Sequence, residues 1–136
     1  MSPQPQKEMP IRSESDIVAT RRTVRAVAQG LGFGITDVTR IVTATSELAR
    51  NIVLYAGSGV IRWRELAKSG SIGVELTLED AGPGIASIEQ AMQAGYTTSG
   101  GLGLGLPGTK RLMDEFEIAS EVGQGTRVTV RKWRRL

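Results

Sequence analysis

The chain has 136 residues, 40% of them hydrophobic and 23% charged, which is typical of one soluble globular domain. It has no cysteine and no histidine, so disulfides, thiolate nucleophiles, Cys- or His-liganded metals and Ser-His catalysis within this chain are excluded. No apolar run approaches the ~20 residues of a membrane span, and residues 1–10 lack the apolar stretch of a signal peptide. We therefore expect a single cytoplasmic domain over residues 1–136.

The net charge of +3 comes mainly from two short basic clusters, Arg21, Arg22 and Arg25 near the start and RKWRRL at the C-terminus. Clusters of this kind are more often a solvated rim, or a contact for an acidic partner, than a nucleic-acid site. We therefore predict no binding of nucleic acid.

The first half of the chain predicts two helices. Residues 1–10 hold three prolines and predict a flexible arm or a short edge strand. Residues 13–16 offer N-caps for a helix, whose apolar positions recur at helical spacing until Gly30 and Gly32. Thr36 or Asp37 caps a second helix, which carries an apolar stripe as far as residue 55 before residues 57–59 end it.

Strand patterns follow in the second half. Residues 60–66 are compatible with a strand, residues 67–71 with a turn, and residues 72–79 alternate with the period of two of a half-buried strand. A capping-box pattern at residues 87–90 predicts a short helix, and Pro107 fits the first residue of a helix carrying Leu112, Met113 and Phe116. Residues 118–122 and 126–133 form a hairpin pattern around a turn at 123–125.

The element order is therefore α-α-β-β-α-α-β-β. Paired hairpins imply antiparallel strands, and one-sided alternation implies a sheet with one face covered by helices. We predict an α/β fold, namely a two-layer α/β sandwich with a mixed, mostly antiparallel sheet.

Residues 99–108, SGGLGLGLPG, are rich in glycine, although glycine weakens helices and strands. Residues 103–108 match the G-x-G-x-x-G dinucleotide fingerprint formally, but loop residues precede them where that motif needs a buried strand. Residues 108–110, Gly-Thr-Lys, invert the order of lysine and hydroxyl that a P-loop needs. The sequence therefore predicts neither a dinucleotide-binding fingerprint nor a P-loop in this segment.

Other segments suit a nucleotide site when taken together. Glu47 and Asn51 are four residues apart and so share one helix face. Asp80 stands at the end of a predicted strand, and Gly82 and Gly84 after it permit a flat ring to approach closely. Taken singly, each of these is more often a surface residue or a turn.

Four segments jointly resemble one family. ELARN (47–51), DAGPG (80–84), GGLGLGLPG (100–108) and GQGT (123–126) are similar, in order and approximate spacing, to the four boxes of the GHKL ATP-binding superfamily. The resemblance covers nearly the whole chain and implies the Bergerat ATP-binding fold. Residues 32–37, 46–59 and 96–118 resemble in wording the small serine/threonine-kinase branch that acts as a switch in bacterial stressosomes.

The resemblance also implies ATP and Mg²⁺ as cofactors and a role for each residue. It makes Glu47 the general base, or the group that orients the acceptor hydroxyl, and it makes Asn51 a ligand of Mg²⁺. It places Asp80 on the adenine amino group with Thr126 close by, and Gly82 and Gly84 where the backbone approaches the base. It lines the phosphates with Thr97, Thr98, Ser99, Gly100, Gly101, Leu102, Gly103, Leu104 and Gly105.

Physical chemistry supports the last assignment, because glycine N–H groups can wrap a polyphosphate without obstruction by side chains. The helix that begins near Pro107 adds its N-terminal dipole to the same anion. Lys110 is a weaker candidate for a phosphate contact, since a lysine is equally expected on a helix surface.

The function implied by the resemblance is phosphorylation of serine or threonine on STAS-domain scaffold proteins (RsbS- and RsbR-like). Once released, the kinase would bind and activate a PP2C-type phosphatase (RsbU-like). An alternative is an anti-sigma factor of the RsbW or SpoIIAB type, which sequesters a sigma factor and phosphorylates its antagonist; it usually has histidine after the asparagine that matches Asn51, so the wording here disfavours it. A degenerate nucleotide-binding adaptor is disfavoured because Glu47, Asn51 and Asp80 are all present.

Overall fold

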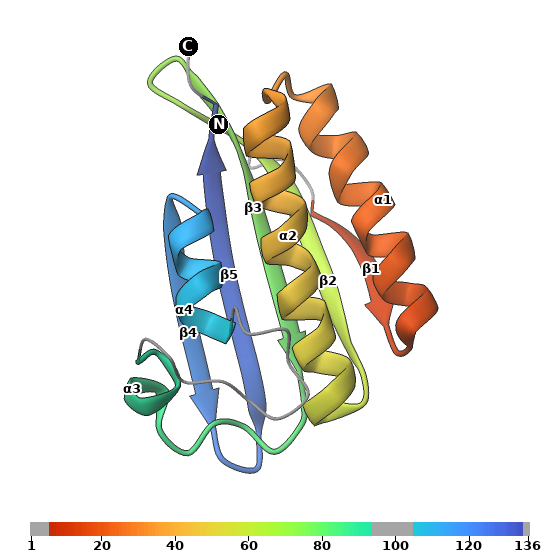
Figure 1. The fold of residues 1–136 in the computed structure, drawn as a ribbon, viewed down its shortest axis with the longest axis vertical. Coiled ribbons are helices and arrows are strands. Elements are labelled where there is room, and N and C mark those ends of the chain that lie inside the picture. The colour runs from red at the N-terminus through yellow and green to blue at the C-terminus, as the bar shows by residue number, and fades with distance from the viewer. Residues whose placement is uncertain (1–5, 94–104, 135–136) are drawn as a thin grey trace.

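The computed structural model describes residues 6–93 and 105–134. In chain order the elements are β1 (Lys7–Ile11), α1 (Glu14–Gly30), α2 (Ile35–Asn51), the π-helix η1 (Ile52–Ala56), β2 (Gly59–Lys68), β3 (Ser71–Asp80), α3 (Ile88–Ala91), α4 (Gly105–Leu112), β4 (Glu115–Glu121) and β5 (Gly125–Trp133). The strands form one sheet in the order β1-β2-β3-β5-β4, and each described pair is antiparallel. Helices α1, α2 and α4 cover one face of it (Figure 1). The predicted two-layer α/β sandwich is confirmed.

The core lies between the helices and the sheet. In β3, Val74, Leu76 and Leu78 are at most 2% exposed and belong to the core, while the residues between them point to the other face. Ile41 of α2 and Val130 of β5 are fully buried in the same cluster. The period-two pattern therefore predicted both the strand and its buried face. No helix in residues 6–93 and 105–134 is long and apolar enough to cross a bilayer.

Several predicted element boundaries are confirmed. Ser13 caps α1, since its side chain accepts the Asp16 N–H, and Ser87 caps α3 by accepting the Gln90 N–H at 3.1 Å. Residues 7–11 form the edge strand that was one of two options for the N-terminus, because β1 pairs with β2 and stands at one end of the described sheet. Gly57, with φ of 85°, stands directly after η1 and ends this helical segment.

Three predicted helix boundaries are wrong. The N-cap of α2 is Gly34, not Thr36 or Asp37, because its extended backbone lets its carbonyl accept the Val38 N–H at 2.9 Å. Helix α4 begins at Gly105, so Pro107 lies inside the first turn, where a missing N–H costs no intrahelical bond. Helix α4 also ends at Leu112, so neither Met113 nor Phe116 belongs to it, and Phe116 lies in β4.

The described part of the C-terminal basic cluster, residues 131–134, is bound within the fold, which corrects the prediction of a solvated rim or partner contact for these residues. Lys132 is 4% exposed, and its Nζ donates to the Leu112 carbonyl at 3.0 Å, at the end of α4. Arg134 donates to the Leu31 carbonyl at 3.1 Å, at the end of α1. Both cations therefore meet carbonyls at helix C-termini, where positive charge is favourable.

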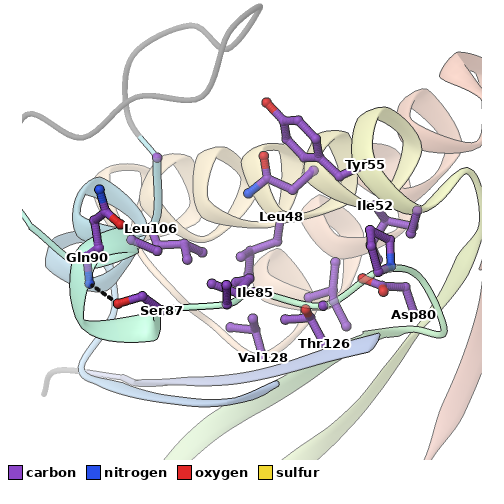
Figure 2. Close-up of a pocket in the computed structure, with 18 residues that line it drawn as sticks. Leu48, Ile52, Tyr55, Asp80, Ile85, Ser87, Gln90, Leu106, Thr126 and Val128 are labelled. Atoms are coloured by element: carbon purple, nitrogen blue, oxygen red, sulfur yellow. Dashed lines mark hydrogen bonds between the residues drawn. The ribbon is translucent and has the colours of Figure 1, made fainter. Parts of the chain in front are cut away.

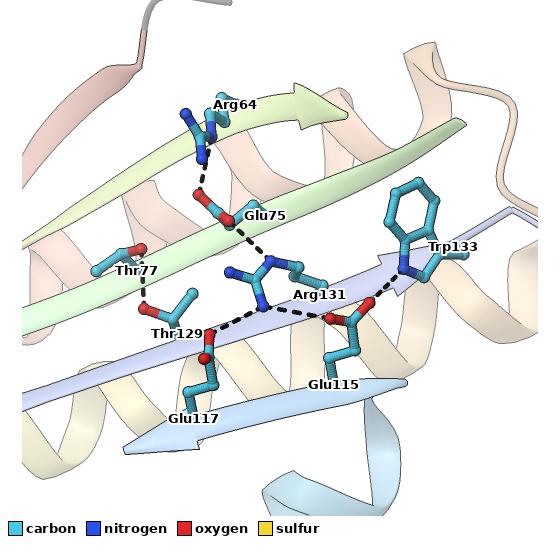
Figure 3. A network of polar contacts seen from close by, with 8 residues as sticks. All are labelled: Arg64, Glu75, Thr77, Glu115, Glu117, Thr129, Arg131 and Trp133. Atoms are coloured by element: carbon cyan, nitrogen blue, oxygen red, sulfur yellow. Dashed lines mark hydrogen bonds and ion pairs between the residues drawn. The ribbon is translucent and has the colours of Figure 1, made fainter. Parts of the chain in front are cut away.

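Arg131 of the same cluster lies in a charged network on the face of the sheet opposite the helices (Figure 3). It bridges the carboxylates of Glu75 at 2.8 Å and Glu117 at 2.9 Å, and Arg64 meets Glu75 from the other side at 2.9 Å. Desolvation lowers the pKa of Arg131, but hydrogen bonds and the charges of Glu75 and Glu117 outweigh it, so this pKa is raised. Arg131 therefore stays charged and paired.

Candidate functional site

A cavity of about 430 Å³ opens beneath the end of α2, between η1, the segment after β3, the start of α4 and β5 (Figure 2). The residues that line it are Leu48, Asn51, Ile52, Tyr55, Ala56, Leu78, Asp80, Pro83, Gly84, Ile85, Ala86, Ser87, Gln90, Ala91, Gly105, Leu106, Thr126 and Val128. Its walls are mostly aliphatic, with Leu48 and Ile52 from the helical layer and Val128 from the sheet. An apolar slot with few polar groups is typical of a site for a flat organic ring.

Asp80 and Thr126 lie together at one end of this cavity, while Ser87, Gln90 and Leu106 lie toward the other (Figure 2). Asp80 ends β3, and the sheet register sets it directly opposite Thr126 on β5. Its Oδ1 accepts the Gly82 N–H at 2.9 Å, which fixes the orientation of the carboxylate. The predicted proximity of these two residues is thus present in the fold.

The segment after β3 is held against the β4–β5 hairpin. The Gly123 N–H donates to the Pro83 carbonyl at 2.8 Å, and the Ile85 N–H donates to Ser120 Oγ at 2.8 Å. Gly84 has a φ of +77°, and a Cβ there would collide with the Glu121 carbonyl. The packing of the protein itself therefore requires this glycine. Its suggested approach to a nucleotide base stays a prediction.

Gly82 has a similar structural reason. A Cβ at this position would lie 2.5 Å from the Ala56 Cβ at the end of η1. Unlike Gly84, Gly82 does not line the cavity. Its suggested contact with a base also stays a prediction.

The end of α2 carries the two polar residues of the first box. Asn51 lines the cavity, and no residue that the structure describes makes a hydrogen bond to its side chain. Glu47, one turn earlier, is 8% exposed and forms an ion pair with Arg50 at 3.2 Å, and it does not line the cavity. From Ile52 the helix widens into the π form, with the Gly57 N–H bonded to the Ile52 carbonyl at 2.8 Å. Single π-helical turns occur frequently at functional sites.

The fold thus brings together Asn51, Asp80, Gly84, Gly105 and Thr126 in one cavity. Lys110 is exposed on α4 and does not line it. The predicted phosphate-lining residues 97–104 lie outside the described residues.

The sequence reasoning missed three polar or aromatic lining residues, Tyr55, Ser87 and Gln90. Tyr55 was predicted as part of the apolar stripe, but it stands four residues after Asn51 and therefore shares a helix face with it. Ser87 and Gln90 were assigned only to a helix cap. A strand, loop and helix that surround one cavity cannot be recognised from local patterns alone.

The chemistry of the lining fits a purine nucleotide. Aliphatic walls suit the ring, and the Asp80 carboxylate suits an amino group on its edge. No cluster of three acidic residues that could hold a metal ion occurs among residues 6–93 and 105–134. Mg²⁺ typically keeps few protein ligands and takes the remaining oxygens from phosphates and water, so one amide such as Asn51 suits it.

Comparisons with known proteins identify the family of this chain. Residues 10–132 match the family model of the histidine kinase-like ATPase domain. The chain is 54% identical over 125 residues to the serine/threonine-protein kinase RsbT of Bacillus subtilis, covering 92% of this chain and 94% of that one. This relative confirms the prediction of an ATP-dependent protein serine/threonine kinase. An anti-sigma F factor of Geobacillus thermodenitrificans is 34% identical over 128 residues, covering 89% of this chain and 86% of that one.

Among solved structures, the RsbU and RsbW domains of Rv1364c from Mycobacterium tuberculosis share the fold with a TM-score of 0.68 at 21% identity. That match covers 98% of this chain, which spans only 34% of the two-domain chain. The arrangement of Asn51, Asp80 and Thr126 around one cavity and the match over residues 10–132 lead to one conclusion: the chain belongs to the histidine kinase-like ATPase domain family.

Proposed function

We propose that the protein uses Mg-ATP to phosphorylate serine or threonine on STAS-domain scaffold proteins and, once released, binds and activates a PP2C-type phosphatase. The observation that carries the proposal is the cavity in which Asn51, Asp80 and Thr126 meet. The 54% identity to RsbT supports the choice of kinase branch.

Each residue then has a chemical task. The Asp80 carboxylate accepts a hydrogen bond from the adenine amino group, and aliphatic walls cover the ring. The side-chain oxygen of Asn51 is a ligand for Mg²⁺, which when bound neutralises phosphate charge. Glu47 accepts the proton of the attacking hydroxyl or orients that hydroxyl. The N–H groups of residues 97–105 surround the phosphates.

The arginines of α1 form the proposed partner surface. Arg21, Arg22 and Arg25 line a shallow hollow of about 220 Å³ together with Val18, which is 46% exposed. None of the three forms an ion pair with a residue that the structure describes, in contrast to the bound cations of the C-terminal cluster. An acidic partner can therefore pair with them without breaking an existing contact.

Phosphorylation supplies a reason for release of the scaffold. A phosphoserine adds about −1.5 to −2 charges to an interface formed around a neutral hydroxyl. It does so close to Glu47 and to the phosphates of the spent nucleotide. The kinase thus weakens its own docking site, and the same surface becomes available to the phosphatase.

The 34% identity to anti-sigma F factors favours a second candidate, sequestration of a sigma factor combined with phosphorylation of its antagonist. Incubation with Mg-ATP and purified STAS-domain proteins, followed by mapping of the phosphorylated residues, tests the kinase proposal. Competition binding then compares unmodified scaffold, phosphorylated scaffold, phosphatase and sigma factor. Equal affinity for both scaffold forms would refute the switch, and tight binding of a sigma factor would favour the second candidate.

A further inference from the structure

Two parts of the cavity wall meet at the hydroxyl of Ser120 on β4. Its Oγ lies 2.8 Å from the Ile85 nitrogen, 3.0 Å from the Gly125 carbonyl oxygen and 2.8 Å from Thr126 Oγ1. Ile85 and Thr126 line the cavity, whereas Ser120 itself does not. One side chain therefore joins the segment after β3 to the beginning of β5.

The number of protons fixes the direction of these hydrogen bonds. A serine hydroxyl has one proton and two lone pairs. The Ile85 N–H can only donate and the Gly125 carbonyl can only accept, so Ser120 gives its one proton to Gly125. Its remaining lone pair is satisfied only if Thr126 is the donor in their contact. If Ser120 instead donated its proton to Thr126, no proton would lie between Ser120 Oγ and the Gly125 carbonyl oxygen, which are 3.0 Å apart.

It follows that the proton of Thr126 is already used within the protein. The lone pairs of Thr126 Oγ1 remain for the cavity that this residue lines. Asp80, its cross-strand partner, is a carboxylate with Oδ1 bound to the Gly82 N–H, so it also offers lone pairs only.

We propose that Ser120 is a positioning residue that makes this end of the cavity a pair of acceptors, Asp80 and Thr126. Two adjacent acceptors select a ligand group with two N–H bonds, and the exocyclic amino group of adenine is such a group. This inference rests on the proposed nucleotide site and adds the residue that sets its selectivity.

The test compares ATP with purine riboside triphosphate, which has a hydrogen atom in place of the amino group. Calorimetry gives the dissociation constant of each nucleotide. The selectivity ratio is the dissociation constant of purine riboside triphosphate divided by that of ATP. Ser120→Ala frees the Thr126 proton to turn toward the cavity, so the ratio falls about two- to tenfold, the value of one neutral hydrogen bond. A merely structural role of Ser120 would weaken both nucleotides equally and leave the ratio unchanged.

Two further variants serve as controls. Ser120→Thr keeps the hydroxyl and retains the wild-type ratio. Thr129→Val removes a hydroxyl that lies 3.3 Å from the Thr77 hydroxyl on the opposite face of the sheet (Figure 3). We expect this variant to retain the wild-type selectivity ratio as well.

Thr126→Val removes the acceptor but leaves the bonds of Ser120 to Ile85 and Gly125, so it lowers the ratio in the same way. It decides the question if Ser120→Ala does not fold. An unchanged ratio in either folded variant overturns the inference while the ATP site stands. If the wild-type protein does not bind ATP, the proposed function is refuted as well.

Discussion

Replacement of Asp80 by asparagine can reverse the polarity of the cavity end without disturbing the local turn. In the structure Asp80 Oδ1 accepts the Gly82 N–H at 2.9 Å, and the second carboxylate oxygen is available to a ligand. In Asp80→Asn the turn persists only if the amide oxygen faces Gly82, because the NH₂ group cannot accept a hydrogen bond. The NH₂ group therefore takes the ligand-facing position, and an acceptor becomes a donor.

The expected effect on binding follows from this exchange. Loss of a hydrogen bond to a charged group costs about 1.5–3 kcal/mol, which is about 10- to 150-fold in the dissociation constant. The NH₂ group also opposes an N–H of adenine, so we expect the weakening of ATP binding near the upper value. Inosine triphosphate carries a carbonyl where adenine has the amine, and it should bind Asp80→Asn more tightly than it binds the wild type.

Calorimetric titration of both nucleotides in the presence of Mg²⁺ measures the change. Glu79→Gln is the matched control, since this neighbouring carboxylate pairs with Arg62 at 2.9 Å and does not line the cavity. We expect it to leave both affinities unchanged. A folded Asp80→Asn protein with wild-type affinity for ATP and unchanged preference over inosine triphosphate would show that Asp80 does not recognise the base.

Other variants test the chemistry and the framework of the site. Glu47→Gln keeps an oxygen for Arg50, so ATP affinity should persist while the initial rate of phosphotransfer falls about 10²–10⁴-fold; an unchanged rate would exclude Glu47 as the base. Lys132→Met removes the buried cation that donates to the Leu112 carbonyl and pairs with Asp37 and Asp114, and urea unfolding should show a loss of about 2–4 kcal/mol in the free energy of unfolding. Lys110 is exposed, so the control Lys110→Met should change the free energy of unfolding by less than about 0.5 kcal/mol. Equal losses in Lys132→Met and Lys110→Met would contradict this explanation. In Gly84→Ala the new Cβ collides with the Glu121 carbonyl at a position of positive φ, so the free energy of unfolding should fall by about 1–3 kcal/mol. A wild-type melting temperature would show that the hairpin adapts to the side chain.

Local sequence patterns predicted an element correctly where a single local interaction determines it. The alternation in residues 72–79 predicted β3 because one face of the sheet is buried, and Ser13 and Ser87 predicted helix starts because their side chains satisfy backbone N–H groups. Phe116 shows the limit of such patterns. It follows Met113 at helical spacing and precedes Ile118 at strand spacing, and a short apolar run cannot distinguish the two.

The basic C-terminus was misjudged for a related reason. Charge alone suggested an exposed surface, but Val128, Val130 and Lys132 occupy alternate positions of β5 and so share its buried face. Extending this alternation by one more step, from Val130 to Lys132, would have predicted that the Lys132 side chain faces the core. The role of Ser120 has no comparable signal, because its contact with Ile85 joins residues 35 positions apart.

The internal pairing of the C-terminal cations changes where an acidic partner can dock. With Arg131, Lys132 and Arg134 engaged, the arginines of α1 are a basic cluster that forms no ion pair in the described part of the chain. Helix α2 packs against both α1 and α4 and lies between them (Figure 1). Its residues Leu48 and Asn51 line the cavity. We infer that a partner holding the α1 arginines while presenting a hydroxyl near Glu47 must pass over α2. A second partner bound to the same arginines would then be excluded by simple overlap, without any change of conformation in the kinase.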